Sequence, residues 1–375
     1  MKIFLAQQNY HSGNIDTNTQ IIIAAVKHDK NSGGDLIVFS ELSVCGYPPR
    51  DFLYFKDFIN KNNTAINAIK QYADGIGVLI GAPVINPSVQ GKDLYNAAWF
   101  LADKEIKQVF YKTCLPTYDV FDEDRYFEPA SKWELLEFKG KKIAVTICED
   151  IWNLGNNPLY TICPMDKLAP LQPDVMINLS ASPFDYTHDK DREAIVKANV
   201  LRYKIPVFYC NTVGSQTEIV FDGASFVMDN KANLCGRLKR FEEDLQAFVL
   251  NDNGSIGTNI LATQEQLPSQ ELTPMQLNEK LNIPLIYEAL VLGIKDYFSK
   301  MGFTKAILGS IGGIYSAVVL ALACEALGKD NVTAMLMPSQ FATTHSVSDA
   351  EQLSKNLNNP YHIIPIKNIY ESFLN

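Results

Sequence analysis

The stretch Lys142-Ile-Ala-Val-Thr-Ile-Cys148-Glu149-Asp150-Ile-Trp152 joins an apolar run typical of a buried strand to a cysteine at its end. Two other predicted strands also lead into reactive side chains. Glu41 follows Val38-Phe-Ser, and Lys112 follows Val109-Phe-Tyr. Loops at strand ends are where a rigid sheet brings together residues that are distant in the chain. A thiol, a carboxylate and an ammonium placed in this way predict an active site on an α/β fold.

Short β-rich runs alternate with helical patterns from residue 2 to about residue 250. Strands are expected at 2–8, 35–40, 77–84, 96–102, 107–112, 142–148, 174–180, 206–212, 224–229 and 246–250, and helices at 14–29, 56–72 and 187–204. Hairpins are expected within 96–112, turning at Asp103-Lys-Glu, and within 221–233, turning near Asp229-Asn-Lys. Crossover helices combined with hairpins indicate one mixed sheet system covered by helices.

Residues 251–279 lack sustained periodicity, which is typical of a linker. A new βα pattern follows, with helix 281–301, strand 305–309, helix 315–327, strand 331–337, helix 346–356, strand 361–365 and a terminal helix. This alternation predicts the opening of a doubly wound parallel sheet. The sequence therefore divides into 1–250, a linker 251–279 and 280–375. A sheet of this kind could fold within the last part, but it would be small.

Composition excludes several classes of protein. The net charge is 33 − 42 = −9, without a Lys/Arg-rich stripe, so nucleic acid is not an expected partner. No apolar stretch approaches the roughly 18–20 residues that a membrane span needs, and we find no signal peptide. The seven cysteines are scattered without a C-x-x-C pair, which indicates reduced thiols and a cytoplasmic location. The five histidines are isolated, so no metal site is predicted.

The three reactive residues suit one kind of chemistry. A cysteine is nucleophilic as its thiolate, which a helix beginning at Cys148 and the charge of Lys112 would both favour. Glu41 could take the thiol proton and later activate a water. Lys112 and a backbone N–H could stabilise the oxyanion formed when the thiolate attacks an amide carbon. The alternative is that Cys148 is an inert buried cysteine and the two charges are solvated loop residues.

The strings around these residues resemble those of the nitrilase superfamily, and more narrowly the glutaminase half of glutamine-dependent NAD synthetases. They occur in the family's order at 39–49, 111–123, 147–152, 178–184 and 221–225. The resemblance implies a nitrilase-like α-β-β-α sandwich with a Glu41–Lys112–Cys148 triad. It implies further supporting or substrate-binding residues: Glu123 beside the triad, Tyr47 and Tyr118 lining a glutamine pocket, Glu149 next to the nucleophile, and Ser182 and Arg192 at the amino-acid end of the substrate. One departure is Gln216-Thr217-Glu218, where the family usually has Gln-Asp-Glu.

The second half resembles the start of the same family's Rossmann-like synthetase domain, an adenine-nucleotide α-hydrolase-like fold. Residues 308–317, Leu-Gly-Ser-Ile-Gly-Gly-Ile-Tyr-Ser-Ala, align with the family's Leu-Gly-Leu-Ser-Gly-Gly-Ile-Asp-Ser-Ala. That loop cradles pyrophosphate and its Asp helps to hold Mg²⁺. The retained candidates for ATP binding are Ser310, Gly312, Gly313 and Ser316. Ile311 and Tyr315 replace the first Ser and the Asp, so ATP binding and the synthetase step are in doubt. The alternative is a tight turn with no ligand.

The resemblance implies that glutamine is hydrolysed through a Cys148 thioester without a cofactor. The ammonia would then amidate nicotinic acid adenine dinucleotide, a step that in the family uses ATP and Mg²⁺, and the family forms homo-oligomers. Two alternatives stay open at this point. The chain could be a stand-alone amidase or nitrilase acting on another small amide, or a non-catalytic subunit of an intact synthetase. A truncated chain, a split gene and a decayed synthetase domain are equally compatible with the sequence.

Overall fold

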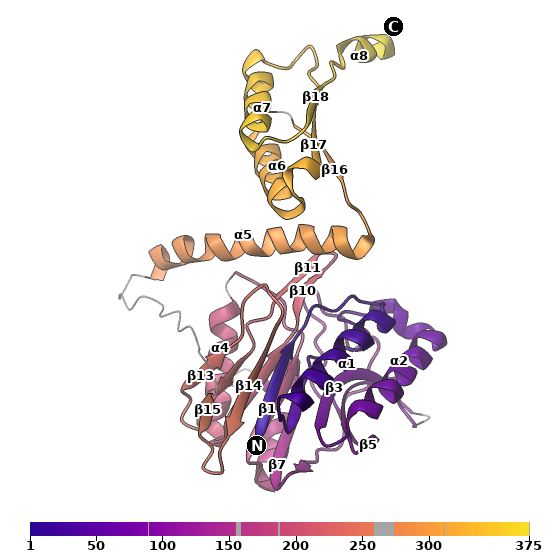
Figure 1. Cartoon of the computed structure of the whole chain (residues 1–375), viewed down its shortest axis with the longest axis vertical. Coiled ribbons are helices and arrows are strands. Elements are labelled where there is room, and N and C mark those ends of the chain that lie inside the picture. Colours follow the sequence, from indigo (N-terminus) through magenta and orange to yellow (C-terminus); the bar gives the residue numbers. More distant parts are fainter. Residues whose placement is uncertain (89, 155–158, 187, 259–273, 311, 375) are drawn as a thin grey trace. The chain divides into compact units, whose positions relative to one another are not determined.

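The computed structural model describes the chain except for residues 89, 155–158, 187, 259–273, 311 and 375. The chain forms two compact units, Met1–Glu271 and Leu272–Asn375 (Figure 1). Most of the predicted linker lies outside the described residues. At its two described ends, however, it is regular: Ile256–Thr258 forms a strand, and a helix begins at Pro274.

Two sheets make up the first unit. The seven-stranded sheet has the order β15-β14-β1-β2-β3-β4-β5, from β1 (Lys2–Gln7), β2 (Leu36–Val38), β3 (Gly77–Ile85), β4 (Leu94–Ala102), β5 (Glu105–Tyr111), β14 (Asp244–Leu250) and β15 (Ile256–Thr258). The six-stranded sheet has the order β13-β12-β9-β8-β7-β6, from β6 (Leu136–Phe138), β7 (Lys141–Ile147), β8 (Val175–Ser180), β9 (Val207–Asn211), β12 (Phe226–Met228) and β13 (Leu234–Arg237). In each sheet three central strands are parallel, β1-β2-β3 and β7-β8-β9.

The two sheets face each other across one apolar core. This core takes Leu5 from β1, Leu79 from β3, Ile143 from β7 and Ile177 from β8. On its outer side the first sheet packs against α1 (Ile15–Asn31) and α2 (Lys56–Ile69), and the second against α3 (Pro164–Leu168) and α4 (His188–Tyr203) (Figure 1). The first unit is therefore an α-β-β-α sandwich, as the resemblance implied. The expectation of one mixed sheet system was wrong.

The central strands explain why the sequence pattern did not separate the two sheets. In β7, Ile143, Val145 and Ile147 face the core between the sheets, whereas Ala144 faces the helix side. A strand that is buried on both faces appears in sequence as one continuous apolar run, so its pattern does not show how many layers surround it.

The expected hairpin within 221–233 was only partly right. Its turn is present, because β12 and β13 pair on either side of residues 229–233. Residues 219–222, however, form β11 (Ile219–Asp222), which pairs with β10 (Val213–Gln216) in a separate two-stranded ribbon. The hairpin of β4 and β5 turns at Asp103 and Lys104, as predicted, and both of these residues have positive φ.

The second unit has a small parallel sheet of order β16-β17-β18, formed by β16 (Ala306–Gly309), β17 (Val332–Leu336) and β18 (Tyr361–Ile363). Its helices are α5 (Pro274–Met301), α6 (Ile314–Leu327), α7 (Thr344–Leu357) and α8 (Lys367–Leu374). A core that includes Leu320 of α6, Ala334 of β17 and Ala350 of α7 joins the sheet to its helices. The βα order matches the sequence prediction. Across the described ranges, no helix is both long and apolar enough to cross a bilayer.

Candidate active site

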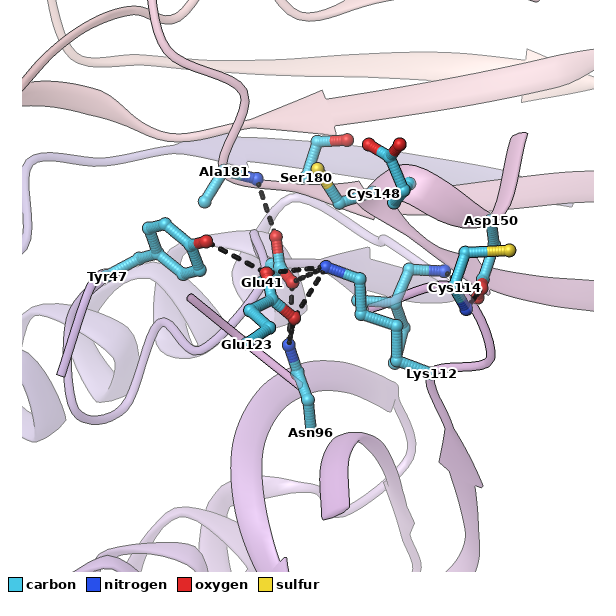
Figure 2. Close-up of polar contacts among 12 residues, drawn as sticks. Glu41, Tyr47, Asn96, Lys112, Cys114, Glu123, Cys148, Asp150, Ser180 and Ala181 are labelled. Atoms are coloured by element: carbon cyan, nitrogen blue, oxygen red, sulfur yellow. Dashed lines mark hydrogen bonds and ion pairs between the residues drawn. The ribbon is translucent and has the colours of Figure 1, made fainter. Parts of the chain in front are cut away.

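Three strand ends from two different sheets meet at one buried point (Figure 2). Glu41 comes shortly after β2, and Lys112 comes directly after β5, both in the seven-stranded sheet. Cys148 comes directly after β7 of the six-stranded sheet. All three side chains are buried. The fold thus brings together the three residues that the sequence singled out.

The ammonium group of Lys112 is fully buried and lies between two carboxylates. Its Nζ donates to Glu41 Oε1 at 2.7 Å and to the two oxygens of Glu123 at 2.7 and 2.8 Å. Burial alone would lower the pKa of Lys112, but the charges of Glu123 and Glu41 together hold it well above its usual value. Lys112 is therefore a fixed positive charge.

Glu41 is held by three donors. Its Oε1 accepts from Lys112 and from Asn96 Nδ2, both at 2.7 Å, and its Oε2 accepts from the backbone N–H of Ala181 at 3.1 Å. Burial raises the pKa of Glu41 to about 7, with the charge of Lys112 opposing the rise and that of Glu123 adding to it. A carboxyl group with a pKa near neutrality can both accept and return a proton at physiological pH.

Cys148 occupies a turn, and its backbone is in the left-handed region with φ of +42°. A non-glycine residue with this conformation is uncommon and often marks a functional site. The expected helix at this position is only a four-residue 3₁₀ turn, Cys148–Ile151. Burial and then the charge of Glu41 raise the pKa of the Cys148 thiol well above its usual value, and Lys112 opposes them. Lys112 thus favours the thiolate, as expected, but burial and the charge of Glu41 outweigh it, which is consistent with the expected role of Glu41 in taking the thiol proton.

Sequence reasoning missed two polar residues of the site. Asn96 in β4 donates its Nδ2 to Glu41 Oε1 at 2.7 Å and to Glu123 Oε2 at 3.1 Å, so it bridges the two carboxylates (Figure 2). Asp150 accepts hydrogen bonds from the backbone N–H groups of Thr113 and Cys114, which follow Lys112, and of Ile147, which precedes Cys148. The available signal for Asn96 was its position as the one amide in the otherwise apolar strand Leu94-Tyr-Asn-Ala-Ala-Trp-Phe-Leu-Ala.

Glu123 and Tyr47 connect the triad to a cavity. The hydroxyl of Tyr47 donates to Glu123 Oε1 at 2.8 Å. Both residues line a cavity of about 490 Å³, although Cys148 does not. The charged side chains of its lining, apart from Glu123, are Arg50, Asp51, Asp119, Asp122, Arg125 and Glu218. Thr217, where the family usually has an Asp, directly precedes Glu218 of this lining. Glu218 forms an ion pair with Arg50 at 2.5 Å.

The carboxylate next to the nucleophile, Glu149, has two tyrosine partners. The hydroxyl of Tyr118 donates to its oxygens at 2.9 and 3.0 Å, and that of Tyr160 donates to Oε1 at 3.3 Å. Burial raises the pKa of Glu149. The negative charge of Glu149 in turn raises the pKa of the Cys148 thiol, because a second negative charge nearby would be repelled.

Ser182 and Arg192 lie differently with respect to the triad. Ser182 follows Ala181, whose N–H reaches Glu41, and its own backbone N–H donates to Asn211 Oδ1 at 2.8 Å. Arg192 is a buried residue of α4, and its Nη2 donates to Asp222 at 2.6 Å. The geometry therefore brings Ser182 close to the triad through the backbone and engages Arg192 in an ion pair. The predicted substrate contacts of both residues stay predictions.

The second unit has a cavity of about 270 Å³ at the carboxyl ends of β16 and β17. Its lining includes Ser310, Met337, Phe341, Thr343 and Ser346. Ser310 is buried, and its Oγ has no hydrogen-bond partner among the described residues. Parallel α/β sheets bind ligands in this place.

The rest of the expected nucleotide loop is a turn at the start of α6. Gly312 has φ of +76°, and a Cβ at this position would come within 2.1 Å of the Ser346 carbonyl oxygen. Gly313 is the N-cap of α6, and Ser316 Oγ donates to its carbonyl at 3.0 Å. Ile311 lies outside the described residues. Tyr315, at the position where the family has an Asp, is 88% exposed. Among the described residues, no cluster of His, Cys, Asp and Glu could hold a metal ion.

Comparisons with known proteins match both units. A family model described as carbon-nitrogen hydrolase matches residues 2–251, and one described as NAD synthase matches residues 286–375. A glutamine-dependent NAD(+) synthetase from Synechocystis is 38% identical over 379 residues, a match that covers 99% of this chain and 65% of that protein. The chain therefore spans somewhat less than two thirds of the length of this relative.

Solved structures agree with these matches. The structure of a glutamine-dependent NAD+ synthetase from Acinetobacter baumannii, in complex with adenosine diphosphate, has a TM-score of 0.86 and 32% identity, and the match covers 100% of this chain and 66% of that one. An amidase of the nitrilase superfamily from Nesterenkonia has a TM-score of 0.57 and 19% identity, and the match covers 66% of this chain and 89% of that one. The second likeness concerns the fold alone.

Proposed function

Because the chain belongs to the carbon-nitrogen hydrolase family, we propose that its first unit hydrolyses a carboxamide through Cys148 and that this amide is the side chain of glutamine. The observation that carries the proposal is the convergence of a buried thiol, a carboxylate with a pKa of about 7 and a fixed ammonium at one point. A merely structural cysteine needs neither of these neighbours.

The reaction follows from the protonation states. Glu41 takes the proton of the Cys148 thiol as Sγ attacks the amide carbon, and the negative charge moves to the amide oxygen. Lys112 stabilises this oxyanion. The C–N bond then breaks, Glu41 returns its proton to the leaving ammonia, and a thioester remains. Water attacks the thioester with Glu41 as base, the C–S bond breaks, and glutamate and the free thiol are released.

Glu149 is the residue that favours glutamine over a simple amide. A buried carboxylate held by two tyrosines beside the nucleophile is suited to bind an α-ammonium group, with Tyr118 and Tyr160 fixing its orientation. We assign Tyr47 to the pocket wall next to Glu123, and Ser182 and Arg192 to the far end of the substrate. The Synechocystis relative is a glutamine-dependent enzyme, which agrees with this substrate.

For the second unit we propose the role of its relatives, the use of ammonia to amidate nicotinic acid adenine dinucleotide in NAD synthesis. The proposal that an adenine nucleotide binds here is supported by the cavity beside Ser310, which is lined by a buried hydroxyl, residues at the N-terminus of α7 and apolar Met337 and Phe341. The residues do not fit Mg²⁺, since Tyr315 offers no charge where the family has an Asp. No step is therefore assigned to the metal. By resemblance to the family we also propose a cytoplasmic homo-oligomer.

Glutamine hydrolysis is tested with the purified chain. We expect equal amounts of glutamate and ammonia from glutamine, and no turnover for Cys148→Ala. Cys235→Ala is the matched control, because Cys235 is a half-buried thiol on β13 and should leave turnover unchanged. Normal turnover by Cys148→Ala would refute the proposal. Faster hydrolysis of another small amide would instead indicate a stand-alone amidase. Lack of labelling of Cys148 by a glutamine-analogue electrophile would indicate a non-catalytic subunit.

The second unit is tested separately with free ammonium, ATP, Mg²⁺ and nicotinic acid adenine dinucleotide. We expect slow NAD formation by the unmodified chain and faster formation by Tyr315→Asp, which restores a carboxylate in the loop. Fast NAD formation by the unmodified chain would show that Tyr315 is compatible with the ATP-dependent step.

A further inference from the structure

Asp150 is a buried carboxylate that holds the backbone of two segments from different sheets. Its Oδ1 accepts from the N–H of Cys114 at 2.9 Å; both residues are labelled in Figure 2. The same oxygen accepts from the N–H of Thr113 at 2.9 Å, and Oδ2 accepts from the N–H of Ile147 at 3.0 Å. Thr113 and Cys114 directly follow Lys112, and Ile147 directly precedes Cys148. We propose that Asp150 is a positioning residue that sets the distance between the Lys112 ammonium and the Cys148 thiol.

This inference rests on the proposed amide hydrolysis and adds a residue to it. Lys112 comes from the end of β5 in one sheet, and Cys148 comes from the end of β7 in the other. In the reaction, Sγ of Cys148 bonds to the amide carbon of the substrate while the oxygen on that carbon becomes an oxyanion within hydrogen-bond reach of the Lys112 ammonium. The two strand ends therefore need a fixed separation. A carboxylate that bonds both ends provides this link.

The bond to Ile147 also stabilises the turn that presents the nucleophile. Cys148 has φ of +42°, a conformation that is unfavourable for a non-glycine residue. The Asp150–Ile147 bond and the bond from Trp152 N–H to the Glu149 carbonyl at 3.0 Å close this turn from both sides. Without the first bond, Cys148 could relax to an ordinary backbone conformation and its Sγ would move.

A simpler interpretation is that Asp150 is only a local cap of the turn. Local capping explains the bond to Ile147, three residues away, but not the bonds to Thr113 and Cys114, which are 37 and 36 residues away in the chain. Two substitutions separate the interpretations. Asn has the same shape as Asp, but one of its two terminal atoms is an NH₂ group, which is a donor. In either orientation of the amide, this NH₂ group faces a backbone N–H, so the hydrogen bond to one of the two segments is lost. Ser has a single side-chain oxygen that lies one bond closer to the backbone, so it cannot bond both segments at once.

Three variants are compared in the full chain: Asp150→Asn, Asp150→Ser and the matched control Asp174→Asn. Asp174 is a suitable control because its Oδ2 accepts from the N–H of Lys142, at the opposite end of the strand that leads into Cys148. For each variant we measure kcat and KM for glutamine, the rate of iodoacetamide alkylation at Cys148 from pH 6 to 9, and the thermal midpoint.

We expect both Asp150 variants to lose about 10- to 100-fold in kcat, the usual effect of displacing a reacting group by about 1 Å, while KM changes less than threefold. Alkylation of Cys148 should slow at least tenfold, and Asp174→Asn should stay within twofold of the unmodified chain. Normal kcat in Asp150→Ser would show that the link between the two segments is not needed and would overturn the proposal. So would a loss in kcat that the unfolded fraction accounts for, or a failure of both Asp150 variants to fold.

The alkylation measurement keeps this test separate from the proposed function. If the unmodified chain does not hydrolyse glutamine, the substrate assignment fails, but the reactivity of Cys148 can still be compared among the variants. Equal alkylation rates in all of them would then refute the positioning role alone.

Discussion

Glu123 shares the Lys112 ammonium with Glu41, so Glu123→Gln should change both the charge and the geometry of the site. Burial raises the pKa of Glu41 to about 7, and the charge of Glu123 adds to that rise. Glu41 acts as a base only when it is deprotonated, so hydrolysis should increase as pH rises through about 7. Because the substitution removes a negative charge beside Glu41, its pKa should fall. The acid limb of the pH profile should therefore move to lower pH.

The magnitude can be estimated from Coulomb's law. Two unit charges roughly 4–5 Å apart interact by about 3–4 kcal/mol at an effective dielectric constant of about 20. At about 1.4 kcal/mol per pKa unit this sets an upper bound of two to three units. Reorientation of neighbouring dipoles reduces the net effect below this Coulomb bound, so we expect the pKa of Glu41 to fall by about one unit. Loss of a charge-assisted bond to Lys112 is worth about 1.5–3 kcal/mol, or roughly 10- to 150-fold in kcat if the oxyanion bears the whole loss.

The assay is ammonia release from glutamine between pH 5 and 9, with Cys148 alkylation followed at the same pH values. Glu218→Gln is the control, because Glu218 lines the same cavity but is exposed and paired with Arg50. Its acid limb should coincide with that of the unmodified chain. An acid limb that stays in place or moves to higher pH in Glu123→Gln would refute the charge assignment, as would an equal shift in the control.

Three further predictions concern stability and the bridging amide. Burial raises the pKa of Asp29 to about 7, so the folded state keeps a proton that the unfolded state releases, and the protein loses stability as pH rises from about 4 to 7. Asp29→Asn removes this effect. The substitution should therefore raise the thermal midpoint by a few degrees at pH 8 and clearly less at pH 5. Gly312→Ala should destabilise the second unit by about 1–3 kcal/mol in urea unfolding, and more than Gly302→Ala, since Gly302 has the same positive φ but open space around it. Asn96→Ala should lower kcat at least tenfold with little change in KM, because both carboxylates lose a donor; an unchanged kcat in steady-state measurements would contradict this role.

The sequence predicted the order of elements well because most of them have a clear period. The strands and helices of the second unit appeared as expected, and α1 begins where Asn14 caps it by accepting from the Thr17 N–H. The number of sheets was not predictable from pattern alone, because β7 is buried on both faces and has no alternation. Short edge strands such as β6, with three residues, carry too little periodicity to be seen.

The candidate site was predictable where its residues lie at strand ends and match family strings, as Glu41, Lys112 and Cys148 do. Asn96 and Asp150 act through hydrogen bonds to residues far away in the chain, and no local pattern records such partners. For a related reason, the sequence identified Lys112 as a charge that favours the thiolate, but not that the carboxylates of Glu41, Glu123 and Glu149 together oppose it.

The charges around Cys148 determine the order of events that the site allows. Glu41, Glu123 and Glu149 all raise the pKa of the thiol, and Lys112 is the cation that opposes them. A thiolate formed in the empty site would add a negative charge to a cluster that is already rich in carboxylates. An α-ammonium group bound at Glu149 would offset one of these charges, and a proton moved from the thiol to Glu41 would offset another. Under the proposed function, bound substrate and a protonated Glu41 would therefore both favour the thiolate. A buried Cys148 with a raised thiol pKa is thus compatible with the proposed nucleophilic role.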